Sequence, residues 1–210
     1  YDAYDSFLKH NGFAKAFPTV DDLTRAMGNV AFYYQGRVIE NIRISNTVDA
    51  YAVNGWESMK LENHSGIVDN YRYPKGDVEV MARYNQPLFL AVKMNRKVLN
   101  VGDTTIVDTY IVNEKNLKGN YSLQLIAKDA EGTVLATHVS SVHVKGGNVY
   151  GQCLQIGWNF VPRATGYVCI EAKLVKGKKT FATGNDSLFA VSLNLSLIHI
   201  SEPTRHSLIS

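Results

Sequence analysis

The sequence is poor in the features that point to a membrane, a nucleic acid or a disulfide-bonded scaffold. It has no run of about 18 or more apolar residues, so no membrane-spanning helix is expected. The 22 Lys and Arg side chains nearly balance the 19 Asp and Glu side chains and are scattered along the chain, so no basic surface for nucleic acid is predicted. The composition therefore favours a neutral partner.

Cysteine is scarce, and common catalytic motifs are missing. Cys153 and Cys169 lie in separate apolar stretches, where they either pair or stay buried as free thiols, the interpretation favoured here because buried cysteine behaves as a small hydrophobe. His138 and His143 are five residues apart on a predicted strand and so point to opposite faces. No Gly-x-Ser-x-Gly elbow and no phosphate-binding glycine loop occurs. No metal and no cofactor is predicted.

The first part of the chain has helical periodicity. Thr19 and Asp22 have the spacing of a capping box, in which side-chain oxygens accept hydrogen bonds from the first unpaired amides of a helix. Apolar residues then recur every three or four positions, which predicts one long helix with one buried face. The predicted face consists of Val20, Leu23, Met27, Val30, Tyr34, Val38 and Ile42.

A short apolar run at residues 48–53 follows this helix and ends at Asn54-Gly55. Such a run after an amphipathic helix is typical of a buried parallel strand in an α/β fold. One helix and one strand do not make a sheet, so we expect the remaining strands upstream of Tyr1.

From about Pro87 the pattern changes to short β-rich runs separated by turns, as in an antiparallel sandwich of immunoglobulin-like size. Turns are predicted at Glu131-Gly132, at residues 146–148 and 184–186, and in an exposed lysine-rich hairpin at residues 176–179. The predicted strands are 88–94, 104–112, 121–128, 134–144, 149–156, 166–175 and 187–191.

The last residues have a different character. Residues 195–205 (Leu-Ser-Leu-Ile-His-Ile-Ser-Glu-Pro-Thr-Arg) resemble a translated sequencing adapter, and the following residues resemble its index and continuation. The segment 194–210 is therefore expected to be an artefactual tail with no role in the fold. The alternative is a genuine C-terminal linker.

Three stretches resemble the end of the catalytic domain of glycoside hydrolase family two, which includes β-galactosidases, β-glucuronidases and β-mannosidases. They are Asn-Gly-Trp-Glu-Ser at 54–58, Leu-Glu-Asn-His-Ser-Gly-Ile-Val-Asp at 61–69 and Arg-Tyr-Pro-Lys-Gly-Asp at 72–77. The resemblance extends over about residues 1–191. It implies an α+β fragment: the incomplete C-terminal end of a (β/α)8, or TIM, barrel at 1–86, with the helix and last strand, followed by an immunoglobulin-like antiparallel β-sandwich at 87–193.

The resemblance also implies a place for the site residues. Active sites of barrel enzymes lie at the carboxyl ends of the strands, so Trp56 would stand at the rim of the sugar pocket, with its indole against the apolar face of a pyranose. The alternative is that Trp56 only fills the top of the barrel. Glu57 and Asn54 are candidates for hydrogen bonds to sugar hydroxyls, or else they tie down a loop.

The catalytic pair is expected to be missing. Retaining hydrolysis uses two carboxyl groups about 5–5.5 Å apart, and the resemblance puts both glutamates upstream of Tyr1. Asp49 lies within a single predicted strand and Glu57, Glu62 and Asp69 follow it, and this clustering in the sequence disfavours an opposed pair. The predicted parent is a bacterial enzyme acting on a carbohydrate, and its relatives suggest the periplasm or secretion. The alternatives are a non-catalytic immunoglobulin-like spacer, a carbohydrate-binding module and a surface adhesion protein.

Overall fold

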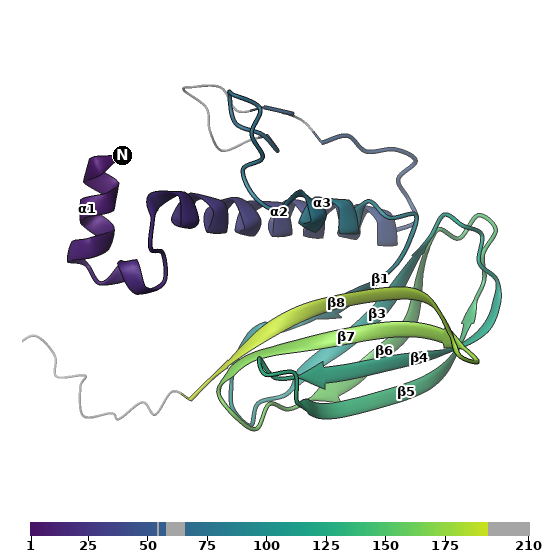
Figure 1. Ribbon diagram of the computed structural model, residues 1–210. Helices are drawn as coiled ribbons and strands as arrows, with labels where there is room; N and C mark the ends of the chain where they lie inside the picture. The colour runs from purple at the N-terminus through teal and green to yellow at the C-terminus, as the bar shows by residue number, and fades with distance from the viewer. Residues whose placement is uncertain (54, 58–65, 193–210) are drawn as a thin grey trace, which may run out of the picture.

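The computed structural model describes residues 1–53, 55–57 and 66–192, which form helices and two β-sheets, with the long helix α2 packed against the sheets (Figure 1). The helices are α1 (Asp2–His10), the 3-10 helix η1 (Phe13–Lys15), α2 (Val20–Ile44) and α3 (Val78–Tyr84). The strands are β1 (Leu88–Met94), β2 (Val98–Asn100), β3 (Thr105–Asn113), β4 (Gly119–Lys128), β5 (Val134–Val144), β6 (Gly151–Phe160), β7 (Gly166–Lys176) and β8 (Lys179–Val191).

The start of α2 is the capping box that the sequence predicts. The Thr19 hydroxyl accepts a hydrogen bond from the Asp22 amide at 3.1 Å, and the Asp22 carboxylate accepts one from the Thr19 amide at 3.1 Å. α3 begins in a similar way, since the Asp77 carboxylate accepts a hydrogen bond from the Glu79 amide at 3.0 Å. Local side-chain chemistry therefore determines where both helices start.

The predicted buried face of α2 is wrong. Met27, Val30, Tyr34 and Val38 are 55% to 65% exposed, and a different stripe is buried. That stripe consists of Gly28, Phe32, Gly36, Ile39, Glu40 and Arg43. Its two glycines allow close approach, because a Cβ at Gly28 would clash with the carbonyl oxygen of Lys75 and one at Gly36 with the ring of Tyr84. A pattern of apolar residues does not include glycine or arginine, so the prediction placed the buried face on the other side of α2.

The predicted β-sandwich is confirmed. One sheet has the order β1-β3-β6 and the other β2-β8-β7-β4-β5. All named strand pairs are antiparallel except β2 with β8, which is parallel. On β7, the alternating residues Val168, Ile170, Ala172 and Leu174 are buried, and this face pairs with the buried side of β4, for example Ile170 with Ala127 and Leu174 with Leu123. These alternating side chains form the core between the sheets.

Most strand positions follow the prediction, and the exceptions have local causes. The runs 88–94 and 134–144 match β1 and β5, and the turns at Glu131-Gly132, 146–148 and 176–179 are confirmed. The predicted turn at 184–186 is wrong, because these residues lie inside β8 and pair with β7. Gly184 instead allows close approach, since a Cβ there would clash with the Leu90 carbonyl. The three-residue β2 was too short for pattern analysis to find.

The predicted barrel strand at residues 48–53 is not a strand. Val48, Tyr51 and Val53 are 50%, 38% and 42% exposed, and the backbone there has no regular hydrogen-bonded structure. A parallel strand obtains its hydrogen bonds from neighbouring strands, and none lies beside this segment in the part of the chain that the structure describes. A barrel fragment is therefore not shown. The described fold is a β-sandwich with helices on one side.

Candidate functional site

The loop that carries the predicted site residues runs from the end of α2 to α3 and is anchored on α2. The carbonyl of Trp56 accepts hydrogen bonds from the amides of Ile67 at 2.9 Å and Val68 at 3.2 Å. Asn29 on α2 accepts a hydrogen bond from the amide of Asp77 at 2.6 Å. The Gly28 and Lys75 backbones lie close together at the same place. The described parts of the loop therefore have a defined position on the helix.

Two of the three predicted sugar-contacting residues lie together on this loop. Trp56 is 64% exposed. The Glu57 carboxylate forms an ion pair with Arg72 at 3.4 Å, so it also helps to hold the loop. Asn54 lies outside the described residues. Tyr71 and Tyr73, which the sequence analysis did not single out, are 75% and 70% exposed on the same loop. A sugar contact by Trp56 or Glu57 stays a prediction.

The other acidic residues of the loop have separate positions. The Asp69 carboxylate accepts hydrogen bonds from the amides of Tyr71 at 2.8 Å and Tyr73 at 2.9 Å, which closes a local turn. Asp49 lines a cavity at the other end of the segment. Glu62 lies outside the described residues. The carboxylates of Glu57 and Asp69 thus have structural partners within the loop.

A cavity of about 680 Å³ lies where the end of α2 meets the sandwich. Tyr51 donates a hydrogen bond to Asn85 at 2.7 Å, and Asn46 accepts one from the Tyr150 amide at 2.7 Å, so contacts on both sides shape its wall. No sequence pattern indicates this cavity, because its lining comes from three separate segments. The lining residues are Ile42, Arg43, Asn46, Val48, Asp49, Ala50, Tyr51, Glu114, Asn148 and Tyr150.

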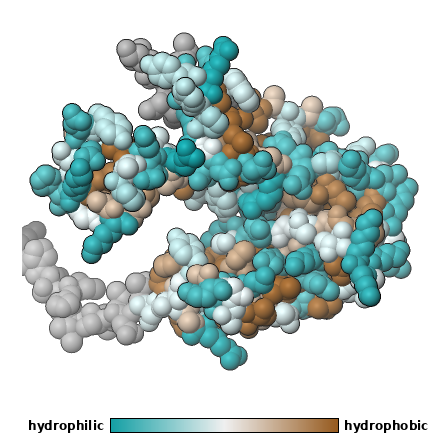
Figure 2. All heavy atoms as spheres, in the orientation of Figure 1, coloured by the Kyte–Doolittle hydropathy of each residue, from teal (hydrophilic) through white to brown (hydrophobic). Residues whose placement is uncertain are grey.

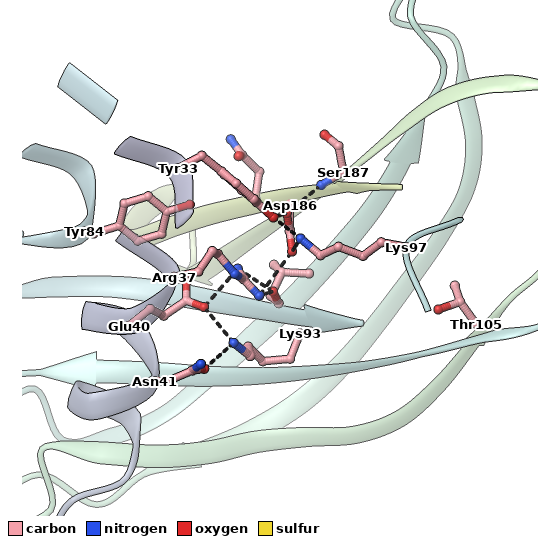
Figure 3. Close-up of polar contacts among 12 residues, drawn as sticks. Tyr33, Arg37, Glu40, Asn41, Tyr84, Lys93, Lys97, Thr105, Asp186 and Ser187 are labelled. Carbon is pink, nitrogen blue, oxygen red and sulfur yellow. Dashed lines mark hydrogen bonds and ion pairs between the residues drawn. The ribbon is translucent and has the colours of Figure 1, made fainter. Parts of the chain in front are cut away.

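A buried ionic cluster joins α2 to the sandwich (Figure 3). We call it the Arg37 cluster, and it consists of Tyr33, Arg37, Glu40, Lys93, Lys97 and Asp186. At its centre, the Arg37 guanidinium lies 2.9 Å from a Glu40 oxygen and 3.2 Å from an Asp186 oxygen. Both terminal nitrogens of Arg37 also donate to the Val92 carbonyl at 3.1 Å. One arginine therefore connects the helix to β1 and β8.

The remaining members of the Arg37 cluster complete the pairing of the two carboxylates. Lys93 lies 3.2 Å from Glu40, and Lys97 lies 2.5 Å from Asp186. The Tyr33 hydroxyl donates a hydrogen bond to Asp186 at 2.9 Å, and Lys97 lies over the Tyr33 ring. The side chains of Glu40 and Asp186 are only 3% and 2% exposed. Because each buried carboxylate faces cations, the cluster serves as a specific contact between helix and sandwich.

Burial opposes the charges of this cluster. It raises the pKa of Glu40 above its ordinary value, although Arg37 and Lys93 act in the opposite direction. Burial also lowers the pKa of Lys93 and of Lys97. Removing these groups from water therefore offsets much of their mutual attraction, so the cluster contributes more to the position of α2 than to net stability.

The raised pKa of Glu40 predicts a pH-dependent effect of Glu40→Gln. A carboxyl whose pKa is higher in the folded state contributes stability that is complete below its unfolded pKa and is lost as the pH rises through its folded pKa. We therefore expect the stability advantage of the unsubstituted chain over Glu40→Gln to shrink as the pH rises from about 4 to 7. Urea unfolding of the unsubstituted chain and of Glu40→Gln at both pH values measures this difference in stability. Glu131→Gln, at an exposed glutamate, is the control for the loss of a carboxylate as such. An advantage that grows with pH for Glu40→Gln would contradict the prediction.

The Arg37 cluster was not predicted from the sequence because its helix residues lie outside the predicted buried face of α2. Tyr33, Arg37 and Glu40 share one face of α2 by their spacing, and Gly36 lies beside them. A helical glycine among charged residues signals a close contact and was the available clue. Asp186 was hidden because it fell in the wrongly predicted turn.

Cys153 and Cys169 are free thiols, which confirms the favoured interpretation. Burial raises the pKa of both, so neither has the features of a reactive thiolate. Within the described ranges, no group of three or more His, Cys, Asp or Glu side chains is arranged to hold a metal ion. The helices of those ranges also include none with the length and apolar character needed to cross a bilayer.

Comparison with known proteins gives weak similarities only. No protein-family model and no curated protein matches the chain. Similar solved structures include a glycosyl hydrolase family 2 member from Bacteroides cellulosilyticus, with 14% identity, 50% of this chain and 15% of that chain covered, and a TM-score of 0.36. A β-glucuronidase from glycoside hydrolase family 2 has 17% identity, 49% of this chain and 11% of that chain covered, and a TM-score of 0.37.

A protein of another kind is equally similar. The CARDB domain of a Pyrococcus furiosus protein, solved in complex with di-metal ions, has 15% identity, 50% of this chain and 93% of that chain covered, and a TM-score of 0.34. This chain spans no more than 15% of the length of the two hydrolases. At these identities and TM-scores the similarities carry no argument about function.

Proposed function

We propose that this chain is part of a glycoside hydrolase related to family two, which hydrolyses the O-glycosidic bonds of β-linked sugars by a retaining mechanism. In this proposal residues 1–86 belong to the end of the barrel, the sandwich follows it, and the catalytic glutamates lie outside the chain. The observation that carries the proposal is the exposed apolar face of α2, formed by Met27, Val30, Tyr34 and Val38.

We expect this exposed apolar face to be covered by another part of the complete protein. The opposite side of α2 is already occupied by α3 and the sandwich, through Phe32 and the Arg37 cluster. Proteins rarely leave large contiguous apolar patches open to water. In a (β/α)8 barrel the helices pack inward on the strands, so barrel strands would cover this face and would also supply hydrogen-bond partners for residues 48–53. Barrel strands would therefore account both for the exposed apolar face of α2 and for residues 48–53, which have no partner strand in the described fold.

The resemblance at residues 54–77 supports the choice of reaction. In a barrel, the residues that follow a strand reach the active-site end, and Trp56 follows residues 48–53 directly. The exposed indole is suited to packing on the apolar face of a sugar. The chain alone is expected to be inactive, because the proposal places both catalytic carboxylates elsewhere.

A second candidate function is a carbohydrate-binding or spacer role for the sandwich, and burial favours the spacer. Binding would need Tyr110, Tyr121, Tyr150 and Trp158 in a line on the surface. Tyr121 is only 8% exposed, Tyr110 and Trp158 are half-buried, and Tyr150 is 51% exposed. The aromatic platform is thus missing among these four residues.

The proposed function is tested by the coding sequence that precedes Tyr1. We expect it to encode a barrel with one strand ending in Asn-Glu and another ending in a glutamate. The complete enzyme should hydrolyse a β-glycoside with retention, while the 210-residue chain alone should not. Upstream sequence that encodes neither glutamate would refute the proposal.

In the complete enzyme, Trp56→Ala is expected to lower kcat/KM by about tenfold, because an aromatic packing contact is worth ~1.4 kcal/mol. Steady-state kinetics on a β-linked substrate measures this change. Tyr71→Ala is the matched control, since Tyr71 is an exposed aromatic residue on the same loop. Equal effects of the two substitutions would assign Trp56 to loop packing.

A further inference from the structure

Six exposed lysines lie at one end of the sandwich, where three connections meet: β3 to β4, β5 to β6, and the β7–β8 hairpin. The first two are in contact, since the Gly147 amide donates a hydrogen bond to Asn116 at 2.7 Å. The hairpin reaches β4, where Lys176 lies over the Tyr121 ring. Figure 2 shows hydrophilic residues at this end, at the right of the view, where the hairpin turns in Figure 1. This surface, here called the lysine end, consists of Lys115, Lys118, Lys145, Lys176, Lys178 and Lys179.

The lysine end carries positive charge without counter-charges. None of its six ammonium groups forms an ion pair in the part of the chain that the structure describes, whereas Lys93, Lys97 and Lys128 do so elsewhere. Glu114, which precedes Lys115, pairs with Arg43 at 2.6 Å instead. The formal net charge of the whole chain is only +3, so this end is a local excess of positive charge. The composition favoured a neutral partner because these lysines come from three separate segments, and only the fold brings them together.

The arrangement of these lysines is unfavourable for the fold itself. Lys176 and Lys179 are directly opposite each other in the β7–β8 register. Lys118 and Lys145 are the residues just beyond the last paired positions of β4 and β5. Like charges opposite each other destabilise a sheet. Conflicts of this kind between a local rule and the fold are expected at functional sites, so these lysines indicate a partner that supplies negative charge.

Two aromatic rings hold part of the lysine end in place. Lys176 Nζ lies 5.5 Å from the centre of the Tyr121 ring, and Lys179 Nζ lies 4.9 Å from the centre of the Phe181 ring. The two rings contact each other edge to face, with their centres 5.2 Å apart. The Tyr121 hydroxyl also donates a hydrogen bond to the Lys118 carbonyl at 3.2 Å. These cation–π contacts restrain the cations before any partner arrives, which lowers the entropy that binding costs.

We propose that the lysine end binds an acidic polysaccharide, a linear glycan that carries carboxylate or sulfate groups. Neighbouring strands are about 4.8 Å apart, so the adjacent strands β5, β4, β7 and β8 present cations across about 15 Å of the sheet end. Charges repeated along an extended glycan match such a series of cations. The lysine ammonium is a point charge on a flexible stem, so it adapts to different spacings. A carbohydrate partner is compatible with the proposed function, but this inference does not depend on it.

The chemistry of the lysine end favours a glycan over a nucleic acid or a membrane. The three connections contain no arginine, whose planar guanidinium makes paired hydrogen bonds to phosphate. Tyr121 is only 8% exposed and Phe181 is half-buried, so neither ring offers a free face for base stacking. The hairpin tip, Lys-Gly-Lys-Lys at 176–179, has no apolar side chain to insert into a bilayer.

Fluorescence anisotropy tests the choice of partner. Labelled polygalacturonate and labelled dextran sulfate are titrated with the full chain, with neutral dextran as the control. We expect saturable binding to at least one acidic glycan, none to neutral dextran, and weaker binding as the salt concentration rises. Failure to bind either acidic glycan at low salt, or equal binding of neutral dextran, would overturn the proposal. Tighter binding of single-stranded DNA or of anionic lipid vesicles would overturn it in favour of that partner.

A double substitution, Lys176→Gln with Lys179→Gln, tests the location of the site. We expect the dissociation constant for the acidic glycan to rise about tenfold or more, because two opposed cations are lost. Lys9→Gln with Lys15→Gln is the matched control, since both lysines are exposed on α1 and η1 and the net charge falls equally. Urea unfolding verifies that both double variants are folded. Equal weakening by the two folded variants would mean attraction to net charge alone and would refute the site.

Discussion

Replacing Asp186 by alanine is expected to lower the free energy of unfolding by about 3–5 kcal/mol, since removing one partner of a buried ion pair leaves the other uncompensated. Asp186 is 4% exposed, accepts a hydrogen bond from the Tyr33 hydroxyl and forms ion pairs with Arg37 and Lys97. Without the Asp186 carboxylate, Arg37 and Lys97 lose a counter-charge in a contact from which water is largely excluded. The Tyr33 hydroxyl also loses its hydrogen-bond acceptor. The intact Arg37 cluster contributes little net stability, but removing one of its charges is still costly because the opposite charges then lack that partner.

Urea unfolding monitored by circular dichroism measures the effect of Asp186→Ala. Asp103→Ala is the matched control, because Asp103 pairs with Arg96 at 2.8 Å with both side chains at least 39% exposed. An exposed pair of this kind contributes about 1 kcal/mol or less. Asp186→Asn should have an intermediate effect because it keeps a hydrogen-bond acceptor. Equal losses for Asp186→Ala and Asp103→Ala would mean that the Arg37 cluster does not hold the helix on the sandwich.

Phe32→Ala is expected to lower the free energy of unfolding by about 3–5 kcal/mol. Phe32 is fully buried on α2 and packs with Ile39, Met81 and Tyr84. Removing the ring both loses its burial and leaves a cavity between α2 and α3, where Gly36 allows Tyr84 to pack directly on the helix backbone. The loss should be accompanied by release of α3 from α2.

Tyr34→Ala is the matched control on the same helix and removes a comparable ring. Tyr34 is 65% exposed on the face that periodicity predicts as buried, so its removal should change stability by about 0.5 kcal/mol or less. Urea unfolding of both variants decides between the two faces of α2. A larger loss for Tyr34→Ala than for Phe32→Ala would mean that the sequence-based face is the one that packs.

Local chemistry makes part of this fold readable from the sequence. The capping box that starts α2 can be recognised in the sequence because Thr19 and Asp22 are only three positions apart. The alternation in β7 predicts its buried face because neighbouring side chains in a strand point to opposite sides. The loop around Trp56 and Glu57 follows from short-range resemblance, and the structure places both residues on one surface loop.

The sequence by itself therefore determined the helix start, most of the strands and their turns, and the apolar interior of the sandwich, because these depend on neighbouring residues. Only the tertiary structure decided which side of α2 is buried, that residues 184–186 continue β8, that residues 48–53 have no partner strand, and that Arg37 meets Asp186. These outcomes depend on which distant backbone comes close enough for a glycine to be required or for a charge to be buried, and such long-range distances leave no periodic signal in the chain.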